Sequence, residues 1–234
     1  MLRVTDIHSY YGAAHVLQGV SLEVGRGEIV GLLGRNGMGK TTTIRSIMNL
    51  RAPEVRSGEV SYNGTRLNGL PPHEIAQHGI ALVPQGRRLF ASLTVTEHLT
   101  MLKPASANHG WTVERAFKTF PRLAERRGHR GNQLSGGERQ MLAVARALML
   151  DPEIVLMDEP SEGLAPVMVQ HLETVISGLR GEGMGILLIE QNLYSALALC
   201  DRIYLMETGC IKHHDSTVNL QAAPNILQRY LGVH

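Results

Sequence analysis

Cysteine, aromatic residues and long apolar runs are all scarce in this chain of 234 residues. Its only cysteines are Cys200 and Cys210, and aromatic side chains make up 4% of the sequence. Two cysteines cannot build a disulfide framework, so we expect a fold held by its hydrophobic core in a reducing compartment. No window approaches the ~18 apolar residues that a membrane-spanning helix needs, and the first ten residues lack the apolar core of a signal peptide.

The chain also lacks a large excess of positive or negative charge. The 23 basic and 21 acidic residues leave a formal net charge of +2, and the arginines are scattered rather than clustered. This weak, dispersed charge argues against a nucleic acid partner. The eleven histidines show no spacing typical of a metal site. The adjacent His213 and His214 would face opposite sides of a strand.

The pattern of apolar residues predicts alternating strands and helices at both ends of the chain. Period-two or continuous apolar runs predict strands over 2–9, 20–24, 28–33, 59–63, 80–83, 154–157, 185–189 and 202–207. Helical spacing predicts helices over 40–48, 71–78, 95–102, 113–120, 138–150, 167–180 and 194–199. Residues 103–111 are expected to be a linker, and 217–234 a helical segment that serves either regulation or packing. Strands alternating with helices predict an α/β fold with a parallel sheet covered on both faces.

A glycine-rich loop follows the apolar strand predicted at 28–33 and leads into a helix. The segment 34–41 reads GRNGMGKT and fits the phosphate-loop pattern G-x-x-x-x-G-K-[ST]. Glycines let backbone N–H groups approach a polyphosphate, and the helix N-terminus adds free donors and a positive dipole end. Lys40 supplies a point charge and the Thr41 hydroxyl an oxygen ligand for Mg²⁺. The expected ATP-binding residues here are Gly34, Asn36, Gly37, Gly39, Lys40, Thr41 and Thr42.

A pair of carboxylates ends the apolar strand predicted at 154–157. Asp158 and Glu159 would lie at the C-terminal edge of a parallel sheet, which is where ligands bind in such sheets. We expect Asp158 to hold Mg²⁺ and Glu159 to polarise the attacking water as a general base, a role worth about 10²–10⁴-fold in rate. Without the phosphate loop the pair would be read as an acidic turn before Pro160.

Between these two segments, a Ser-Gly-Gly sequence opens a predicted amphipathic helix. Ser135, Gly136 and Gly137 can form a second anion-binding helix start, although such a sequence alone is more often a simple cap. The order of phosphate loop, Ser-Gly-Gly segment and Asp-Glu strand resembles the ATP-binding cassette (ABC) family, over essentially the whole chain. The resemblance implies a P-loop NTPase (RecA-like) parallel core with an N-terminal antiparallel β subdomain. Residues 1–85 and 151–234 would form the nucleotide core, with the helical subdomain at 86–150.

The resemblance also implies further roles for individual residues. Tyr11 resembles the aromatic residue that stacks on adenine, with Tyr10 as a competitor. Gln85 looks like the glutamine that contacts Mg²⁺ and water and couples to a permease. In the family the Ser-Gly-Gly segment contacts the γ-phosphate bound to the opposite subunit. One cassette must therefore pair with a second, as a homodimer or heterodimer, and work with membrane permease subunits.

The chain departs from the usual family pattern at two positions. Gln191 stands where the family usually has a histidine; it can donate a hydrogen bond but carries no charge. Ala165 replaces an aspartate of the expected dimer seam. These departures, with the segments 86–90 (GRRLF) and 120–123 (FPRL), look like the second ATPase subunit of branched-chain amino-acid importers. In such a system, a periplasmic binding protein delivers the substrate and the ATPase lies on the cytoplasmic face of the membrane.

Other functions compete with this interpretation. Close relatives would serve urea or short-amide importers or a lipopolysaccharide exporter. A soluble cassette acting on nucleic acid or ribosomes would usually carry two cassettes or a coiled-coil insertion, and neither is present. A nucleotide-binding scaffold that does not hydrolyse ATP is disfavoured by Glu159.

Overall fold

The computed structural model describes residues 1–104 and 109–231. Its strands are β1 (Leu2–Tyr11), β2 (Ala14–Val24), β3 (Ile29–Leu33), β4 (Glu54–Tyr62), β5 (Thr65–Arg66), β6 (Ile80–Val83), β7 (Ile154–Asp158), β8 (Gly185–Glu190), β9 (Arg202–Glu207) and β10 (Cys210–Ser216). Its helices are α1 (Lys40–Ile47), α2 (Pro72–Gln77), α3 (Val95–Thr100), α4 (Val113–Thr119), α5 (Pro121–Glu125), α6 (Gly136–Leu148), α7 (Pro166–Gly181), α8 (Leu193–Leu199), α9 (Thr217–Ala222) and α10 (Pro224–Leu231). A 3₁₀ turn spans Gly131–Gln133.

The strands form two sheets, as the sequence predicts. A six-stranded sheet has the order β10-β9-β3-β8-β7-β6, and a four-stranded sheet has the order β2-β1-β4-β5. The central strands β3, β7 and β8 are buried along their whole length because both faces of the larger sheet are covered. Pairing is parallel from β9 through β6 and antiparallel throughout the smaller sheet. The α/β fold with a parallel core and an N-terminal antiparallel sheet is therefore confirmed.

The structure differs from the sequence prediction mainly at the sheet edges. Strand β10 was not predicted; it joins β9 in antiparallel fashion and adds the one antiparallel pair described in the larger sheet. Strands β2 and β4 begin earlier than expected because each continues into exposed positions, where the apolar pattern fades. His213 lies partly buried and His214 exposed on β10, as expected for neighbours on a strand. The expected linker 103–111 and helical segment 217–234 fall partly outside the described residues.

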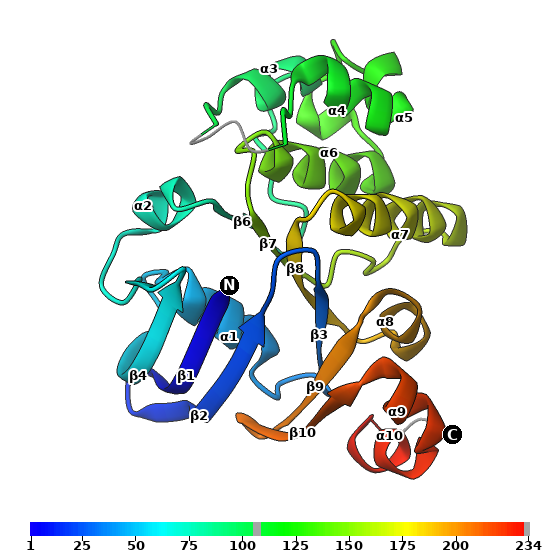
Figure 1. The fold of residues 1–234 in the computed structure, drawn as a ribbon. Helices are drawn as coiled ribbons and strands as arrows, with labels where there is room; N and C mark the ends of the chain where they lie inside the picture. Colours follow the sequence, from blue (N-terminus) through cyan, green and yellow to red (C-terminus); the bar gives the residue numbers. More distant parts are fainter. Residues whose placement is uncertain (105–108, 232–234) are drawn as a thin grey trace.

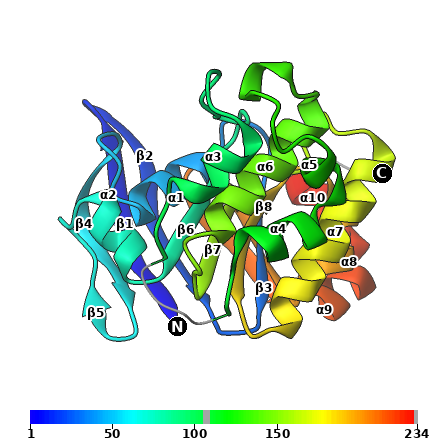
Figure 2. The same cartoon turned by 90° about the horizontal axis from the view of Figure 1, so that it is seen from above.

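Two hydrophobic clusters lie on the two faces of the larger sheet. One joins the sheet to helices α3 to α10, and the other joins it to α1, α2 and the antiparallel sheet. Figure 1 shows α3, α4, α5 and α6 gathered at one end of the molecule, away from the antiparallel strands. Seen from above, β1, β2 and β4 lie on one side of the core strands, and α7 and α8 on the other (Figure 2). Helices α3 to α6, which lie within the segment 86–150, thus form a helical layer that packs against the sheet near β6 (Figure 1).

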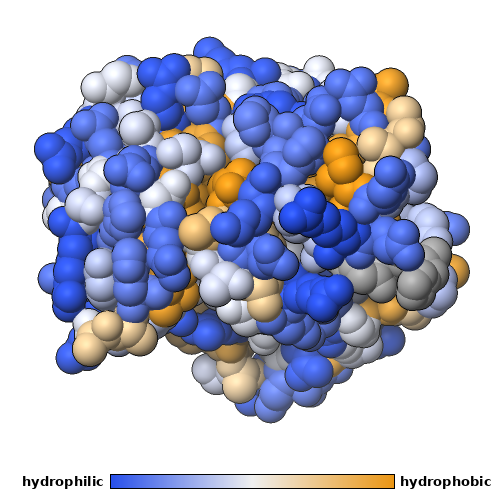
Figure 3. Space-filling view, turned by 90° about the horizontal axis from the view of Figure 1, so that it is seen from below, coloured by the Kyte–Doolittle hydropathy of each residue, from blue (hydrophilic) through white to orange (hydrophobic). Residues whose placement is uncertain are grey.

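One face of the molecule is mainly polar (Figure 3). On the face viewed from below, polar side chains predominate and apolar ones form small, separated patches (Figure 3). No helix within the described part of the chain is long and apolar enough to cross a membrane. Cys200 is buried and Cys210 partly buried, and neither is bonded to the other. Cys200 therefore fills the core, as an apolar residue would.

Candidate nucleotide-binding site

The phosphate loop connects β3 to α1 at the C-terminal edge of the larger sheet. Gly37 and Gly39 have φ values of 79° and 106°, a backbone region that favours glycine. A Cβ on Gly34 would lie 2.4 Å from the carbonyl oxygen of Met206 on β9, so only glycine fits there. These glycines let the loop turn tightly and direct it over the start of α1.

Lys40 is held inside the loop by its own backbone. Its Nζ donates to the carbonyl oxygens of Gly34, at 2.7 Å, and Arg35, at 3.2 Å. The same atom lies 3.5 Å from Oε1 of Glu159, and the Lys40 side chain is only 4% exposed. The ammonium group therefore sits between the loop and the end of β7, as the two sequence motifs predict.

The carboxylates that end β7 lie against the start of α1. The Thr41 hydroxyl donates to Oδ1 of Asp158 at 3.0 Å. Burial, followed by the negative charge of Glu159, raises the pKa of Asp158 to about 6, while the Thr41 bond opposes that rise. Two oxygen ligands of the kind that Mg²⁺ prefers are thus in contact.

Glu159 adopts a left-handed conformation with φ of 48°. Its backbone N–H donates to the carbonyl oxygen of Ile189 at 3.0 Å, which fixes the turn after β7 against β8. Its side chain accepts a 3.0 Å hydrogen bond from Nε2 of Gln85. A non-glycine residue with positive φ stores strain, and such strain is common at functional sites.

Gln85 follows β6 and connects two carboxylates. Its Nε2 donates to Oε2 of Glu159 and to Oε2 of Glu162, each at 3.0 Å. Only the amide nitrogen can donate to two carboxylates, so these contacts fix the orientation of the amide. Its Oε1, the amide atom able to ligate a metal ion, accepts no hydrogen bond from the residues that the structure describes.

A cavity of about 410 Å³ brings most of the predicted residues together. Its lining consists of Val16, Asn36, Gly37, Met38, Gly39, Lys40, Thr41, Thr42, Gln85, Glu159, Glu162 and Gln191. Gln191, predicted from its position alone, therefore lies at the same cavity as the phosphate loop. Gly34 and Asp158 lie beneath the lining, where Gly34 accepts from Lys40 and Asp158 from Thr41.

Tyr11 and the Ser-Gly-Gly segment do not line this cavity. Tyr11 is 37% exposed at the end of β1, where Val16 of the paired strand lines the cavity instead. Ser135 is exposed and caps α6, accepting from the Glu138 N–H at 3.3 Å, while Glu138 accepts from the Ser135 N–H at 2.8 Å. Within one chain, therefore, Ser135 acts as a helix cap.

Sequence analysis missed three residues near the cavity. Glu162 accepts from Gln85, and Arg87 donates to the Glu162 carbonyl oxygen. Glu190 is buried and accepts from the Ser161 N–H at 3.2 Å, and burial raises its pKa. Each lies within three residues of a predicted one, but neither spacing nor apolar pattern distinguishes it from an ordinary loop residue. Ala165 is the N-cap residue of α7 and provides no side-chain cap.

Comparisons with known proteins agree with this geometry. The family model described as ABC transporter matches residues 17–162, more than half of the chain. The chain is 43% identical over 234 residues to BraG, the high-affinity branched-chain amino acid transport ATP-binding protein of Pseudomonas aeruginosa, covering 99% of this chain and 100% of BraG. It is 36% identical to LivF of Archaeoglobus fulgidus, a probable branched-chain amino acid transport ATP-binding protein, with 89% of each chain covered. It is 33% identical to LptB of Haemophilus influenzae, a lipopolysaccharide export system ATP-binding protein, covering 99% of this chain and 97% of LptB.

Solved structures show the same fold. An ATP-binding subunit of an ABC transporter matches with a TM-score of 0.81 and 31% identity, covering 99% of this chain and 96% of that one. A nucleotide-free ATP-binding cassette from an ABC transporter matches with a TM-score of 0.83 and 26% identity, covering 100% and 99%. The chain therefore belongs to the ABC transporter ATPase family, and it binds and hydrolyses ATP.

Proposed function

We propose that this chain is the ATP-hydrolysing subunit of an importer for branched-chain or related amino acids. The similarity to BraG over the full length supports the amino-acid substrate class. LptB relatives are less similar, at 33% identity, and Gln191 and Ala165 also argue against lipopolysaccharide export. Urea or short-amide import is the nearest alternative. The observation that carries the catalytic proposal is the position of Glu159, 3.5 Å from Lys40 at the phosphate-loop cavity.

The phosphate loop provides the binding energy for the triphosphate. Lys40 now donates to its own loop, at Gly34 and Arg35. On binding, its ammonium group transfers from these neutral carbonyl oxygens to the charged β- and γ-phosphates, which form stronger hydrogen bonds. Asn36, Gly37, Gly39 and Thr42 offer backbone donors at the start of α1, and Tyr11 stacks on adenine.

The residues at the end of β7 fit a magnesium ion. Thr41 and Asp158 oxygens lie 3.0 Å apart beside the phosphate loop, and Oε1 of Gln85 is the third candidate ligand. A bound Mg²⁺ would neutralise charge that develops on the phosphate oxygens. A cation here would also favour the ionised form of Asp158, whose pKa burial raises.

Glu159 is the general base of the proposed reaction. Its carboxylate takes the proton of the water that attacks the γ-phosphorus, a contribution of about 10²–10⁴-fold. Gln85 donates to that carboxylate and fixes its direction. Gln191 lines the same cavity and is placed to donate to a γ-phosphate oxygen.

The proposed working unit is a dimer of two cassettes, either two copies or this chain with a related one. Ser135, Gly136 and Gly137 of each subunit would contact the γ-phosphate bound to the other. The division into a nucleotide core, 1–85 and 151–234, and a helical subdomain, 86–150, allows ATP binding to move one part against the other. A periplasmic binding protein would deliver the substrate to the permease, on whose cytoplasmic face the dimer would lie.

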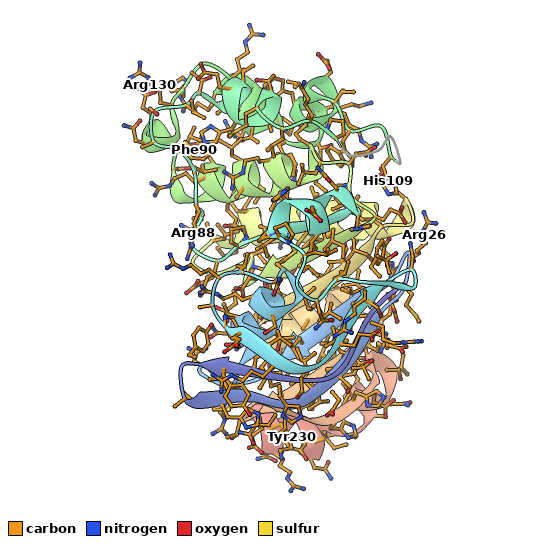
Figure 4. The ribbon with its side chains drawn as sticks, turned by 90° about the vertical axis from the view of Figure 1, so that its left-hand side faces the viewer. Arg26, Arg88, Phe90, His109, Arg130 and Tyr230 are labelled. Carbon is orange, nitrogen blue, oxygen red and sulfur yellow. The ribbon has the colours of Figure 1, made fainter. Side chains whose placement is uncertain are left out.

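Contact with permease subunits is assigned to the segment that links β6 to α3. Figure 4 shows Arg88 and Phe90 on this segment, between the core and the helical layer. Phe90 is 51% exposed, so its apolar ring is accessible to a partner. Because Gln85 begins the same segment, a partner that binds here would act directly on the cavity.

The test is the isosteric variant Glu159→Gln. We expect it to bind ATP, to hydrolyse ATP at least about 10²-fold more slowly, and to dimerise with ATP, because the base is lost and the binding groups remain. Phosphate release and light scattering measure the two effects. Glu59→Gln, at an exposed position on β4, is the matched control and should change neither. A variant that stays monomeric with every nucleotide would contradict the proposed dimer.

The substrate is tested separately. The chain would be reconstituted with its permease subunits in proteoliposomes, and uptake of leucine would be compared with uptake of urea and acetamide. We expect ATP-dependent uptake of leucine alone. Uptake of urea without leucine would favour the alternative importer class.

A further inference from the structure

A second cavity lies beside the first, next to the Ser-Gly-Gly segment. It has a volume of about 500 Å³ and shares Glu159 and Glu162 with the phosphate-loop cavity. Two arginines line it, Arg87 from the segment after Gln85 and Arg139 from the first turn of α6. The positive dipole end of this 13-residue helix adds to their charge.

The Arg87 guanidinium lies directly against the start of α6. A Cβ on Gly136 would be 2.5 Å from Nη1 of Arg87, and a Cβ on Gly163 would be 3.2 Å from its Nη2. Arg87 also donates to the carbonyl oxygen of Glu162. The Arg87 guanidinium therefore borders the glycine at position 136, so an anion that reaches this helix start also meets a positive charge.

No carboxylate of the described residues lies within ion-pair distance of the Arg87 guanidinium. Neither Arg87 nor Arg139 forms an ion pair with a carboxylate of the described residues, and Nε of Arg139 is buried without a hydrogen-bond partner there. A guanidinium has five N–H donors, so the bond to Glu162 leaves others available. Arg87 also has a φ of 51°, a left-handed conformation that is unfavourable for a residue with a Cβ. Strain of this kind is usually retained where a side chain has a task.

We propose that Arg87 is a further catalytic residue, whose guanidinium binds the γ-phosphate of the ATP held by the opposite subunit. This inference rests on the proposed dimer, in which that phosphate meets Ser135, Gly136 and Gly137. An arginine fork suits phosphate oxygens and stabilises the charge that develops on them. It also supplies the positive charge that Gln191 lacks. The bond to Glu162 holds the fork in position.

The first experiment measures ATP-driven dimerisation in the Glu159→Gln background. We expect Arg87→Ala to raise the ATP concentration for half-maximal dimerisation at least tenfold, as for removal of one charge-assisted donor. Arg87→Lys should recover part of the loss, because it restores the charge without the fork. ADP binding to the monomer should be unchanged, since the group acts on the other subunit's nucleotide, and this measurement also verifies folding. Arg66→Ala, at an exposed position on β5, removes the same charge and serves as the control, so it should leave the dimerisation midpoint unchanged.

An unchanged midpoint for Arg87→Ala, with a dimerising Glu159→Gln parent, would overturn this inference and leave the proposed function intact. A parent that never dimerises would overturn both. The two failures are thus distinguishable.

A second experiment decides which subunit's ATP Arg87 contacts. In the same background, chains with Arg87→Ala are mixed with chains with Lys40→Ala, and the dimer yield is measured at limiting ATP. If Arg87 acts across the dimer, a mixed pair keeps one complete site, so mixing should raise the yield above that of either variant alone. If Arg87 acted on its own subunit's ATP, every mixed pair would lack a complete site. A yield that mixing does not raise would therefore overturn the inference.

Discussion

The phosphate-loop edge (residues 34–42) and the Ser-Gly-Gly edge (residues 135–137) carry the same kinds of group. Within one chain, only the first is held in a geometry ready for nucleotide. At the phosphate loop, Lys40 is 4% exposed and contacts Gly34, Arg35 and Glu159. At the other edge, Ser135 is exposed and its hydroxyl serves as the cap of α6. Both edges place a hydroxyl and glycines at a helix start.

This difference indicates that the first edge can function within one chain, whereas the second needs another molecule. The backbone of the phosphate loop is in place before the ligand arrives, and only the Lys40 ammonium group must change partners, so the loop should bind nucleotide in a single chain. The Ser-Gly-Gly edge is complete as a helix cap and gains a second role only when another molecule brings a phosphate to it. Nucleotide affinity and dimer formation should therefore respond to different mutations.

The largest expected effect comes from Ser135→Ala. Loss of the cap should lower the free energy of unfolding by about 1 kcal/mol. Loss of a donor to the partner's phosphate should lower kcat by about 10²-fold, as for removal of one oxyanion donor. Denaturant unfolding and steady-state ATPase assays measure the two effects, and ADP binding to the monomer should not change.

Ser216→Ala is the matched control for the cap. Ser216 caps α9 by accepting from the Asn219 N–H at 3.2 Å, a bond like that of Ser135. We expect the same loss of stability without the loss of activity. If both variants lost activity equally, Ser135 would have no role beyond capping, and the two edges would not differ as described.

A smaller effect, which depends on pH, concerns His98 of α3, in the helical layer. This ring is fully buried; its Nε2 accepts from the Phe90 N–H at 3.0 Å, and its Nδ1 lies 2.8 Å from the Thr94 carbonyl oxygen. Burial lowers its pKa, Arg146 lowers it further, and the Thr94 bond and Glu97 oppose the change. The neutral ring thus ties the segment after Gln85 to α3.

Because the pKa of His98 is lower in the folded state, the unfolded chain takes up a proton on His98 at a higher pH than the folded chain does. Stability should therefore fall as the pH drops below the unfolded value of about 6.5, by at most ~1.4 kcal/mol per pH unit. Comparing the unfolding free energy of the wild type with that of His98→Gln between pH 7 and 5 measures this contribution. Equal slopes for the two proteins would show that His98 does not carry it.

The phosphate-loop edge could be predicted from the sequence because its residues are adjacent in the chain and their types are dictated by the ligand. The same holds for Asp158 and Glu159, since a fully apolar strand places them at the edge of a parallel sheet. Gln85 and Gln191 were assigned by family resemblance, and both line the phosphate-loop cavity.

The remaining features depend on contacts between distant segments, which a single sequence does not display. Strand β10 exists because β9 offers an edge, and its own residues show no clear alternation. The Arg87 guanidinium donates to the carbonyl oxygen of Glu162, which is 75 positions away in the chain. Neither residue stands out in the sequence without that contact. Gly136 was predicted to belong to an anion-binding helix start, but its proximity to the Arg87 guanidinium could not be predicted from the sequence.

The smallest expected effect concerns adenine, at the far end of the phosphate-loop edge. Ser9 of β1 contacts Ser46 of α1 at 2.8 Å, so the alternation of side chains directs Tyr11 toward the same face. Tyr10 is already engaged, because His15 stacks on its ring at 4.3 Å and the Arg56 guanidinium lies 4.3 Å from its centroid.

We therefore expect Tyr11→Ala to weaken ATP binding to the monomer by about 0.5–1.5 kcal/mol, and Tyr10→Ala to leave it unchanged. Tripolyphosphate, which has no base, should bind both variants like the wild type, because the phosphate loop is intact. Calorimetric titration with the two ligands measures both predictions. A loss of ATP affinity in Tyr10→Ala alone would assign adenine to the outer face of β1 instead. Weaker tripolyphosphate binding in Tyr11→Ala would mean that the side chain supports the loop rather than the base.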